Sequence, residues 1–148
     1  MRISGKGRYA LAAVISMAQQ YHSGENITVI SISGKLGISK IYLEQAFSLL
    51  KRGGLVASVK GAQGGYQLTH MPNQMTVLDV LSAVDSALFE KAEETVLEKA
   101  PDIEAAMRLS AFDVLDRSVK DTLRKITLSD LISEAERQKA DSALMFYI

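Results

Sequence analysis

The chain has 148 residues and no cysteine, and its 17 Lys or Arg balance 17 Asp or Glu, so its net charge is zero. Disulfides, thiolate metal sites and cysteine-ligated iron–sulfur clusters are therefore excluded. No apolar run approaches the roughly 20 residues that a membrane span needs, and the charged N-terminus does not resemble a signal peptide. We expect a cytoplasmic protein that has no contact with a membrane.

The charges are distributed unevenly along the chain. Residues 1–75 hold eight Lys or Arg against two acidic residues, a net charge of +6, and residues 76–148 therefore carry −6. A basic half beside an acidic half is typical of one DNA-facing module joined to one that faces elsewhere, although uneven surfaces on a single domain would also give it. With turn residues at 71–73, the sequence predicts one domain over 1–75 and a second, helical region over 76–148.

The first half predicts three helices. An alanine-rich run over residues 9–22 has helical apolar spacing, and Thr28 can cap a short second helix. Ser39 caps a third helix, which ends with a glycine cap at residues 53–54. One side of this third helix is expected to be core, because its apolar residues recur with helical spacing: Leu43, Ala46, Phe47 and Leu50.

Two short strands are predicted over residues 55–59 and 66–69, around a basic, glycine-rich loop. A helix followed by such a hairpin is the winged helix-turn-helix pattern, which places one helix in a DNA major groove and the hairpin on the backbone. Lys60 and Gly61 are the predicted DNA contacts, and the loop glycines are expected to take positive φ. A nucleotide-binding loop is the rival interpretation, but no phosphate-binding motif is present and a strand follows the loop.

The outward side of the third helix carries the candidate readers of DNA. Ser39 and Tyr42 suit phosphate or base-edge contacts, Gln45 suits adenine, and Ile41 suits a thymine methyl group. Lys40 also faces outward. Glu44 either reads a cytosine amino group or excludes wrong sites. The alternative is an ordinary surface helix.

The second half predicts a capped helix from Thr76 to Val84 and a long helix from Pro101 to about residue 125. Apolar residues on more than one stripe of the long helix are expected if it packs on its own domain and on a second subunit. Thr127 begins a final capped turn. The chain then ends in four apolar residues that either pack in a core or dimer seam or dock into a partner's pocket: Met145, Phe146, Tyr147 and Ile148.

Catalysis has little support in the sequence. No Ser/His/Asp set or glycine-flanked nucleophile is present, and the two histidines have no carboxylate or second histidine at ligand spacing. We therefore expect no enzyme activity, no metal and no cofactor.

Three segments together closely resemble the Rrf2-type bacterial transcription regulators over about residues 1–85: MRISGKGRYAL, ISKIYLEQAFSLLKRGGLVASVKGAQGGYQL and VLDVLSAVD. The resemblance implies an α+β, mostly α fold, in which winged helix-turn-helix domains are joined through a long C-terminal dimerisation helix. It also implies a homodimer that binds imperfect palindromes in double-stranded DNA. Ser39, Tyr42 and Gln45 match the family's recognition-helix positions, Lys60 matches the basic wing position, and Lys6 and Arg8 match a basic N-terminal segment near the phosphates.

One departure from the family pattern concerns the signal that regulates the protein. Cluster-binding members carry three cysteines between the winged domain and the long helix, and residues 86–107 contain none. The cysteine-free pattern and the MFYI ending resemble the branch that represses cysteine metabolism. For that branch the resemblance implies a protein co-regulator, cysteine synthase, whose active site accepts C-terminal peptides ending in isoleucine, so that Ile148 would be the anchor. The alternative function is a helix-turn-helix adaptor that binds proteins and never DNA.

Overall fold

The computed structural model describes residues 2–61 and 64–146 and confirms the mostly helical, α+β architecture. Its helices and strands are, in chain order, α1 (Gly5–Gln19), α2 (Val29–Leu36), α3 (Lys40–Arg52), β1 (Val56–Ser58), β2 (Tyr66–Leu68), α4 (Val77–Val84), α5 (Pro101–Met107), α6 (Asp113–Arg124) and α7 (Leu128–Phe146). Short 3₁₀ turns lie at Tyr21–Ser23, Pro72–Gln74 and Ser86–Phe89, and a π-helical segment, Arg108–Phe112, joins α5 to α6.

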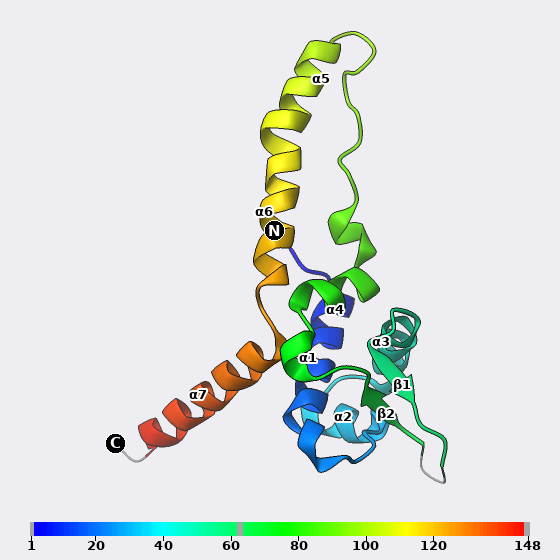
Figure 1. Ribbon diagram of the computed structural model, residues 1–148, viewed down its shortest axis with the longest axis vertical. Helices are drawn as coiled ribbons and strands as arrows, with labels where there is room; N and C mark the ends of the chain where they lie inside the picture. The colour runs from blue at the N-terminus through cyan, green and yellow to red at the C-terminus, as the bar shows by residue number, and fades with distance from the viewer. Residues whose placement is uncertain (1, 62–63, 147–148) are drawn as a thin grey trace.

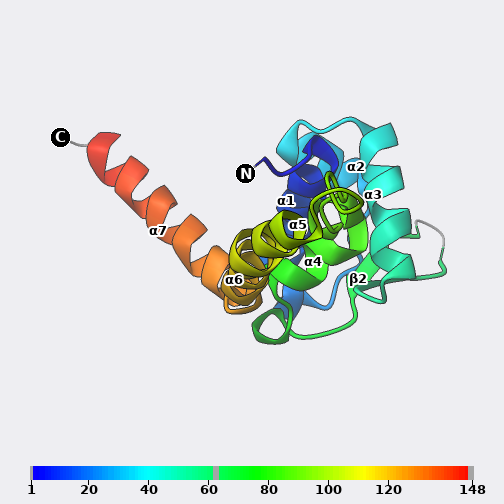
Figure 2. The same cartoon turned by 90° about the horizontal axis from the view of Figure 1, so that it is seen from above.

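The molecule consists of a compact body and two projections (Figures 1 and 2). Helices α1 to α4 and the β1–β2 hairpin form the body. The helical run from α5 to α6 and the segment 86–100 beside it form a long arm, and α7 leaves the body in a different direction. Among the described residues, no helix is long and apolar enough to cross a membrane.

Helix α1 begins earlier than the sequence pattern predicted. Ser4 is its N-cap, and the Ser4 hydroxyl accepts a hydrogen bond from the Gly7 N–H at 3.0 Å. A serine that satisfies one of the free amide groups of the first turn stabilises a helix start at that position. Lys6 and Arg8 therefore lie in the first turn of α1 and not in an extended segment ahead of it.

The core lies between α1, α3 and α4, and all four predicted core residues of α3 are fully buried. The Phe47 ring stacks on the Tyr66 ring of β2, with 4.5 Å between the centroids. Tyr66 also exchanges two backbone hydrogen bonds with Ile27, at 2.8 and 3.0 Å. These contacts fix the root of the hairpin beneath α3.

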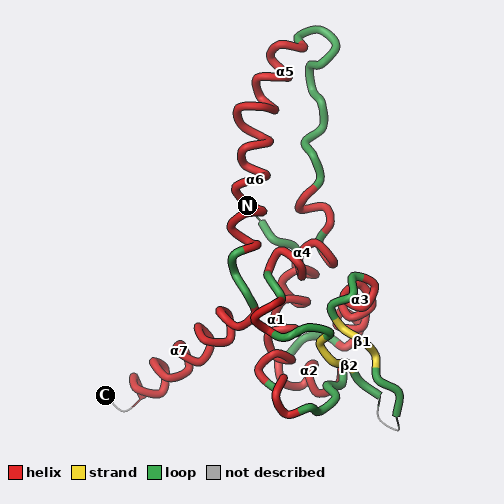
Figure 3. Tube along the Cα trace, in the orientation of Figure 1, coloured by secondary structure: helices red, strands yellow, loops and turns green. Residues whose placement is uncertain are grey.

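The predicted hairpin is confirmed, with antiparallel pairing of Val56 opposite Leu68. Figure 3 shows how short its two strands are. Gly64 and Gly65 have φ values of 63° and 123°, as expected, whereas Gly61 does not have a positive φ. The prediction for Gly61 was wrong because its carbonyl accepts the Gly64 N–H at 3.2 Å, which places the left-handed residues at the closing end of the turn.

In the second half, the capping box of α4 is confirmed, and Pro101 does begin a long helical run. The π-helical segment within that run was not predicted. Glu104, which is buried, accepts hydrogen bonds from the Thr95 and Val96 N–H groups and so ties the segment 86–100 to α5. Leu128 is also buried in the body. The division of the chain near residue 75 stays a prediction.

The final capped turn is in fact the start of a 19-residue helix, so the prediction of a single turn followed by a tail was wrong. Thr127 and Asp130 exchange the two hydrogen bonds of a capping box. No glycine or proline follows before Phe146 to end the helix. Arg137 also pairs with Glu134 three residues earlier, at 2.6 Å, a spacing at which side chains on a helix are neighbours.

Candidate DNA interface

The outward side of α3 is accessible along its first two turns. Ile41 and Tyr42 are 66% and 54% exposed, and Lys40 and Gln45 are exposed beside them. The same turns bury Leu43 completely in the core. The helix is thus held rigidly from below, which is what a recognition helix needs in order to present side chains to base edges.

Ser39 occupies the N-cap position of α3, as predicted, but its side chain makes no capping hydrogen bond. The Ser39 residue is exposed. Its hydroxyl and the first amide groups of α3 can therefore meet an anion such as a DNA phosphate.

Lys40 and Glu44 form an exposed ion pair, with 3.7 Å between Nζ and the carboxylate oxygen. An exposed pair of this kind contributes little to stability. It does place a positive charge beside the one acidic side chain on this part of α3, which would lower the repulsion between Glu44 and a phosphate that came near it.

A hollow of about 310 Å³ lies between the start of α1 and α3, and it brings together three of the predicted site residues. Lys6, Tyr42 and Gln45 line it with Gly5 and Tyr9. The Tyr9 and Tyr42 rings stack with 5.8 Å between centroids and 18° between planes. This stack supports α3 from α1.

Tyr9 was missed by the sequence analysis. It lies on an alanine-rich helix, and the role of one exposed aromatic residue there cannot be inferred until the position of the neighbouring helix is known. The only signal in the sequence was its spacing, three residues after Lys6, which puts the two side chains on one side of a helix.

Arg8 and the wing residues lie outside this hollow. Arg8 is two residues from Lys6, and residues at that spacing on a helix do not face each other. Lys60 and Gly61 are exposed on the hairpin. Within residues 2–61 and 64–146, neither Lys6, Arg8 nor Lys60 forms an ion pair, so these three cations are available to phosphates.

The C-terminal end of α7 is strongly exposed. Leu144, Met145 and Phe146 are 63%, 77% and 93% accessible, so they do not pack into the core of their own chain. Tyr147 and Ile148, the last two residues of the predicted docking tail, lie outside the described residues.

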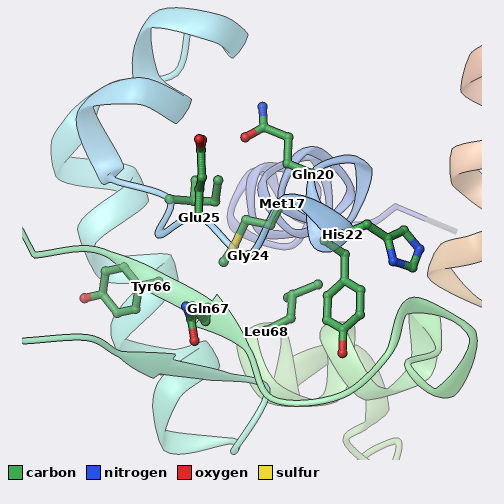
Figure 4. Close-up of a pocket in the computed structure, with 10 residues that line it drawn as sticks. Met17, Gln20, His22, Gly24, Glu25, Tyr66, Gln67 and Leu68 are labelled. Atoms are coloured by element: carbon green, nitrogen blue, oxygen red, sulfur yellow. The ribbon is translucent and has the colours of Figure 1, made fainter.

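A second hollow, of about 320 Å³, lies between the end of α1 and β2 (Figure 4). Its polar groups do not converge on one point: the Glu25 and Gln20 side chains point one way and Gln67 the other. The Gln67 amide is already bonded to Asn26 at 2.8 Å. We therefore assign no ligand to this hollow. Across the described part of the chain, no three His, Cys, Asp or Glu side chains are grouped to hold a metal ion.

Comparison with known proteins decides the family. The family model Rrf2, described as an iron-dependent transcriptional regulator, matches residues 3–134. The chain belongs to the Rrf2 family. It is 38% identical over 151 aligned positions to the HTH-type transcriptional regulator IscR of Pectobacterium carotovorum subsp. carotovorum (strain PC1), covering 95% of this chain and 88% of that protein.

Two solved structures of transcriptional regulators are similar to this fold. T. potens IscR has a TM-score of 0.72 and 31% identity, covering 93% of this chain and 90% of that one. CymR (YrzC), the global cysteine regulator of B. subtilis, has a TM-score of 0.71 and 33% identity, covering 90% and 98%. Membership makes this chain a DNA-binding transcriptional regulator and not an enzyme, whereas the two structures do not separate the IscR and CymR branches.

An iron–sulfur cluster of the cysteine-ligated kind does not fit this Rrf2 protein. Such clusters are held by thiolates, and the sequence contains no cysteine. Nor do the described residues provide a group of three or more His, Asp or Glu side chains as substitutes.

Proposed function

We propose that a homodimer of this chain binds a partly palindromic DNA duplex with one α3 helix in each of two major grooves and acts as a repressor. The observation that carries this proposal is the accessible face of α3 beside Lys6 and Tyr9, held from below by a fully buried apolar face. Gln45 and Ile41 read base edges, whereas Ser39, Lys40 and Tyr42 contact phosphates and fix the register.

The backbone contacts come from two sides of α3. Lys6 and Arg8 approach the phosphates from the first turn of α1, and Lys60 and Gly61 approach from the wing. The three cationic contacts release counterions from the duplex, so they supply affinity that depends on salt and not on sequence.

The second copy in this proposal binds the arm. Exposed apolar side chains extend along α5 to α6, and monomeric proteins rarely leave so many large ones exposed on one element: Ile103, Leu109, Phe112, Val114 and Leu115. A dimer with a twofold axis would bind a palindrome, because the symmetry of an operator mirrors that of the protein.

As the source of the regulatory signal, we propose a protein co-regulator in place of an iron–sulfur cluster. The absence of cysteine removes the thiolate route, and the exposed Met145 and Phe146 present an apolar end to a partner. Cysteine synthase, with Ile148 as the anchor in its active site, is the proposed partner, and cysteine metabolism in the cytoplasm is the proposed process.

The salt dependence of DNA binding tests this function. The probe is the duplex that the wild-type protein selects from a randomised pool. Replacement of Lys60 by Gln should weaken binding to all sequences alike and flatten the slope of log affinity against log salt by about one per lysine, or about two for a dimer. Lys139→Gln removes an exposed charge from α7 and should change neither the affinity nor the slope.

Two results would contradict this proposal. Failure of the wild-type protein to enrich any duplex would favour the protein-binding adaptor. Equal slopes of log affinity against log salt for the wild type and Lys60→Gln would show that Lys60 of the wing does not contact DNA.

A further inference from the structure

Asp85 lies at the C-terminal end of α4 and is only 8% exposed. Its side chain is not used within α4, because Oδ2 accepts the backbone N–H of Ser4 at 3.1 Å, across 81 residues of sequence. A buried carboxylate is costly unless it is hydrogen-bonded or near positive charge. Here it meets the N-terminal end of α1, where the helix dipole favours a negative charge.

The close approach of α1 to Asp85 depends on Gly7. A Cβ atom added at Gly7 would lie 3.1 Å from Asp85 Oδ2, 3.1 Å from Ile3 Cγ2 and 3.2 Å from Leu81 Cδ2. Each of these distances is tighter than ordinary contact, so a side chain at this position would force the Asp85, Ile3 and Leu81 side chains to shift by a few tenths of an ångström. The carboxylate and the small residue opposite it therefore lie where the first turn of α1 packs against the end of α4.

The backbone of Asp85 joins two further elements. Its N–H donates to the Leu81 carbonyl of α4 at 2.8 Å, and its carbonyl accepts the Leu88 N–H of the Ser86–Phe89 turn at 3.0 Å. That turn is the first part of the arm (Figure 1). One residue therefore bonds to α4, to the root of the arm and to the cap of α1.

We propose that Asp85 is a positioning residue for DNA binding, which holds the first turn of α1, with Lys6 and Tyr9, in place against α3 and links that turn to the root of the arm. The inference rests on the proposed function, because it assumes that Lys6 contacts DNA. Asp85 itself touches no DNA. It acts through the Ser4 N–H and through the space above Gly7.

The test compares Asp85→Asn and Asp85→Ala with the control Asp79→Asn. Asparagine keeps an oxygen that can accept the Ser4 N–H, whereas alanine does not. Asp79 is a second carboxylate of α4, but it caps its own helix. Binding to the selected duplex is measured by anisotropy at two salt concentrations, with and without Lys6→Gln, and amide exchange and thermal melting are measured on the same proteins.

Asp85→Ala should lower DNA affinity by several-fold or more and flatten the salt slope. Asp85→Asn should have an affinity and a slope between those of the wild type and Asp85→Ala. The effect of Asp85→Ala on the slope should be smaller when Lys6 is already Gln, since contacts that act through one another are not additive, and what remains should come from Arg8. Amide exchange should become faster over residues 4–9 and 86–89. Asp79→Asn should lower only the melting temperature.

Two outcomes separate this inference from the proposed function. If Lys6→Gln weakens DNA binding but Asp85→Ala binds with the wild-type affinity and slope, then Asp85 is only structural and the inference is overturned. If Lys6→Gln has no effect on DNA binding, then the proposed contact fails, and the role of Asp85 in DNA binding is overturned with it.

Discussion

At the residue level, α3 divides its side chains between two tasks. Leu43 and Phe47 are fully buried, and between them Glu44 and Gln45 are exposed. The buried side chains fix the axis and rotation of α3, so the exposed side chains keep a fixed position relative to the body. Sequence reading by hydrogen bonds needs such fixed geometry, because an amide recognises a base edge only when both of its ends are aligned.

Replacement of Gln45 by Ala should cost about 1–3 kcal/mol of binding free energy at one base position and little elsewhere. The measurement is anisotropy with the selected duplex and with variants in which each base pair is changed in turn. Gln138→Ala removes the same side chain from the exposed face of α7 and should have no effect. A uniform loss of affinity over all the variants would show that Gln45 contacts the backbone instead of a base.

The sequence predicted residues whose role follows from helical periodicity. Leu43, Ala46, Phe47 and Leu50 recur at 3.6-residue spacing, and that alone places them on one face. Tyr9 and Asp85 could not be found in this way. Their contacts with Tyr42 and Ser4 join elements that are far apart in the chain, and local spacing carries no information about how two elements cross.

At the level of elements, sequence signals predicted most helix boundaries, but not the start of α1 or the length of α7. Thr28 and Thr76 both cap helices as expected, because a hydroxyl that accepts an N–H is a local interaction. The length of α7 was underestimated, since its exposed residues give no apolar periodicity. The π-helical segment, Arg108–Phe112, carries no sequence signal that we can identify.

The exposed end of α7 leads to a separate prediction. Deletion of residues 145–148 should abolish binding to cysteine synthase, measured by calorimetry. It should leave the dimer intact in sedimentation, because the proposed dimer contact lies on the arm and not at the end of α7, where Met145 and Phe146 are exposed. If the deletion instead converts the dimer to a monomer, these residues belong to the dimer seam and the docking proposal is wrong.

At the level of the whole molecule, the two halves of the chain differ in charge and in shape. The positive charge of residues 1–75 is spread over the start of α1, α2, α3 and the wing, and the arm and α7 belong to the acidic half. Repulsion from DNA would keep an acidic arm away from the duplex, which leaves it free to contact a second copy. In the proposed dimer, the exposed apolar residues of the arm make that contact.

The most direct test is footprinting of the purified protein on genomic DNA, with Leu115→Glu and the equally exposed Leu144→Glu of α7 as a matched pair. The wild type and Leu144→Glu should protect paired half-sites related by twofold symmetry, with centres about 10 base pairs or a multiple apart. Leu115→Glu should sediment as a monomer and lose this paired protection. Unpaired sites for the wild type, or unchanged protection with Leu115→Glu, would contradict a dimer that reads a palindrome through two α3 helices.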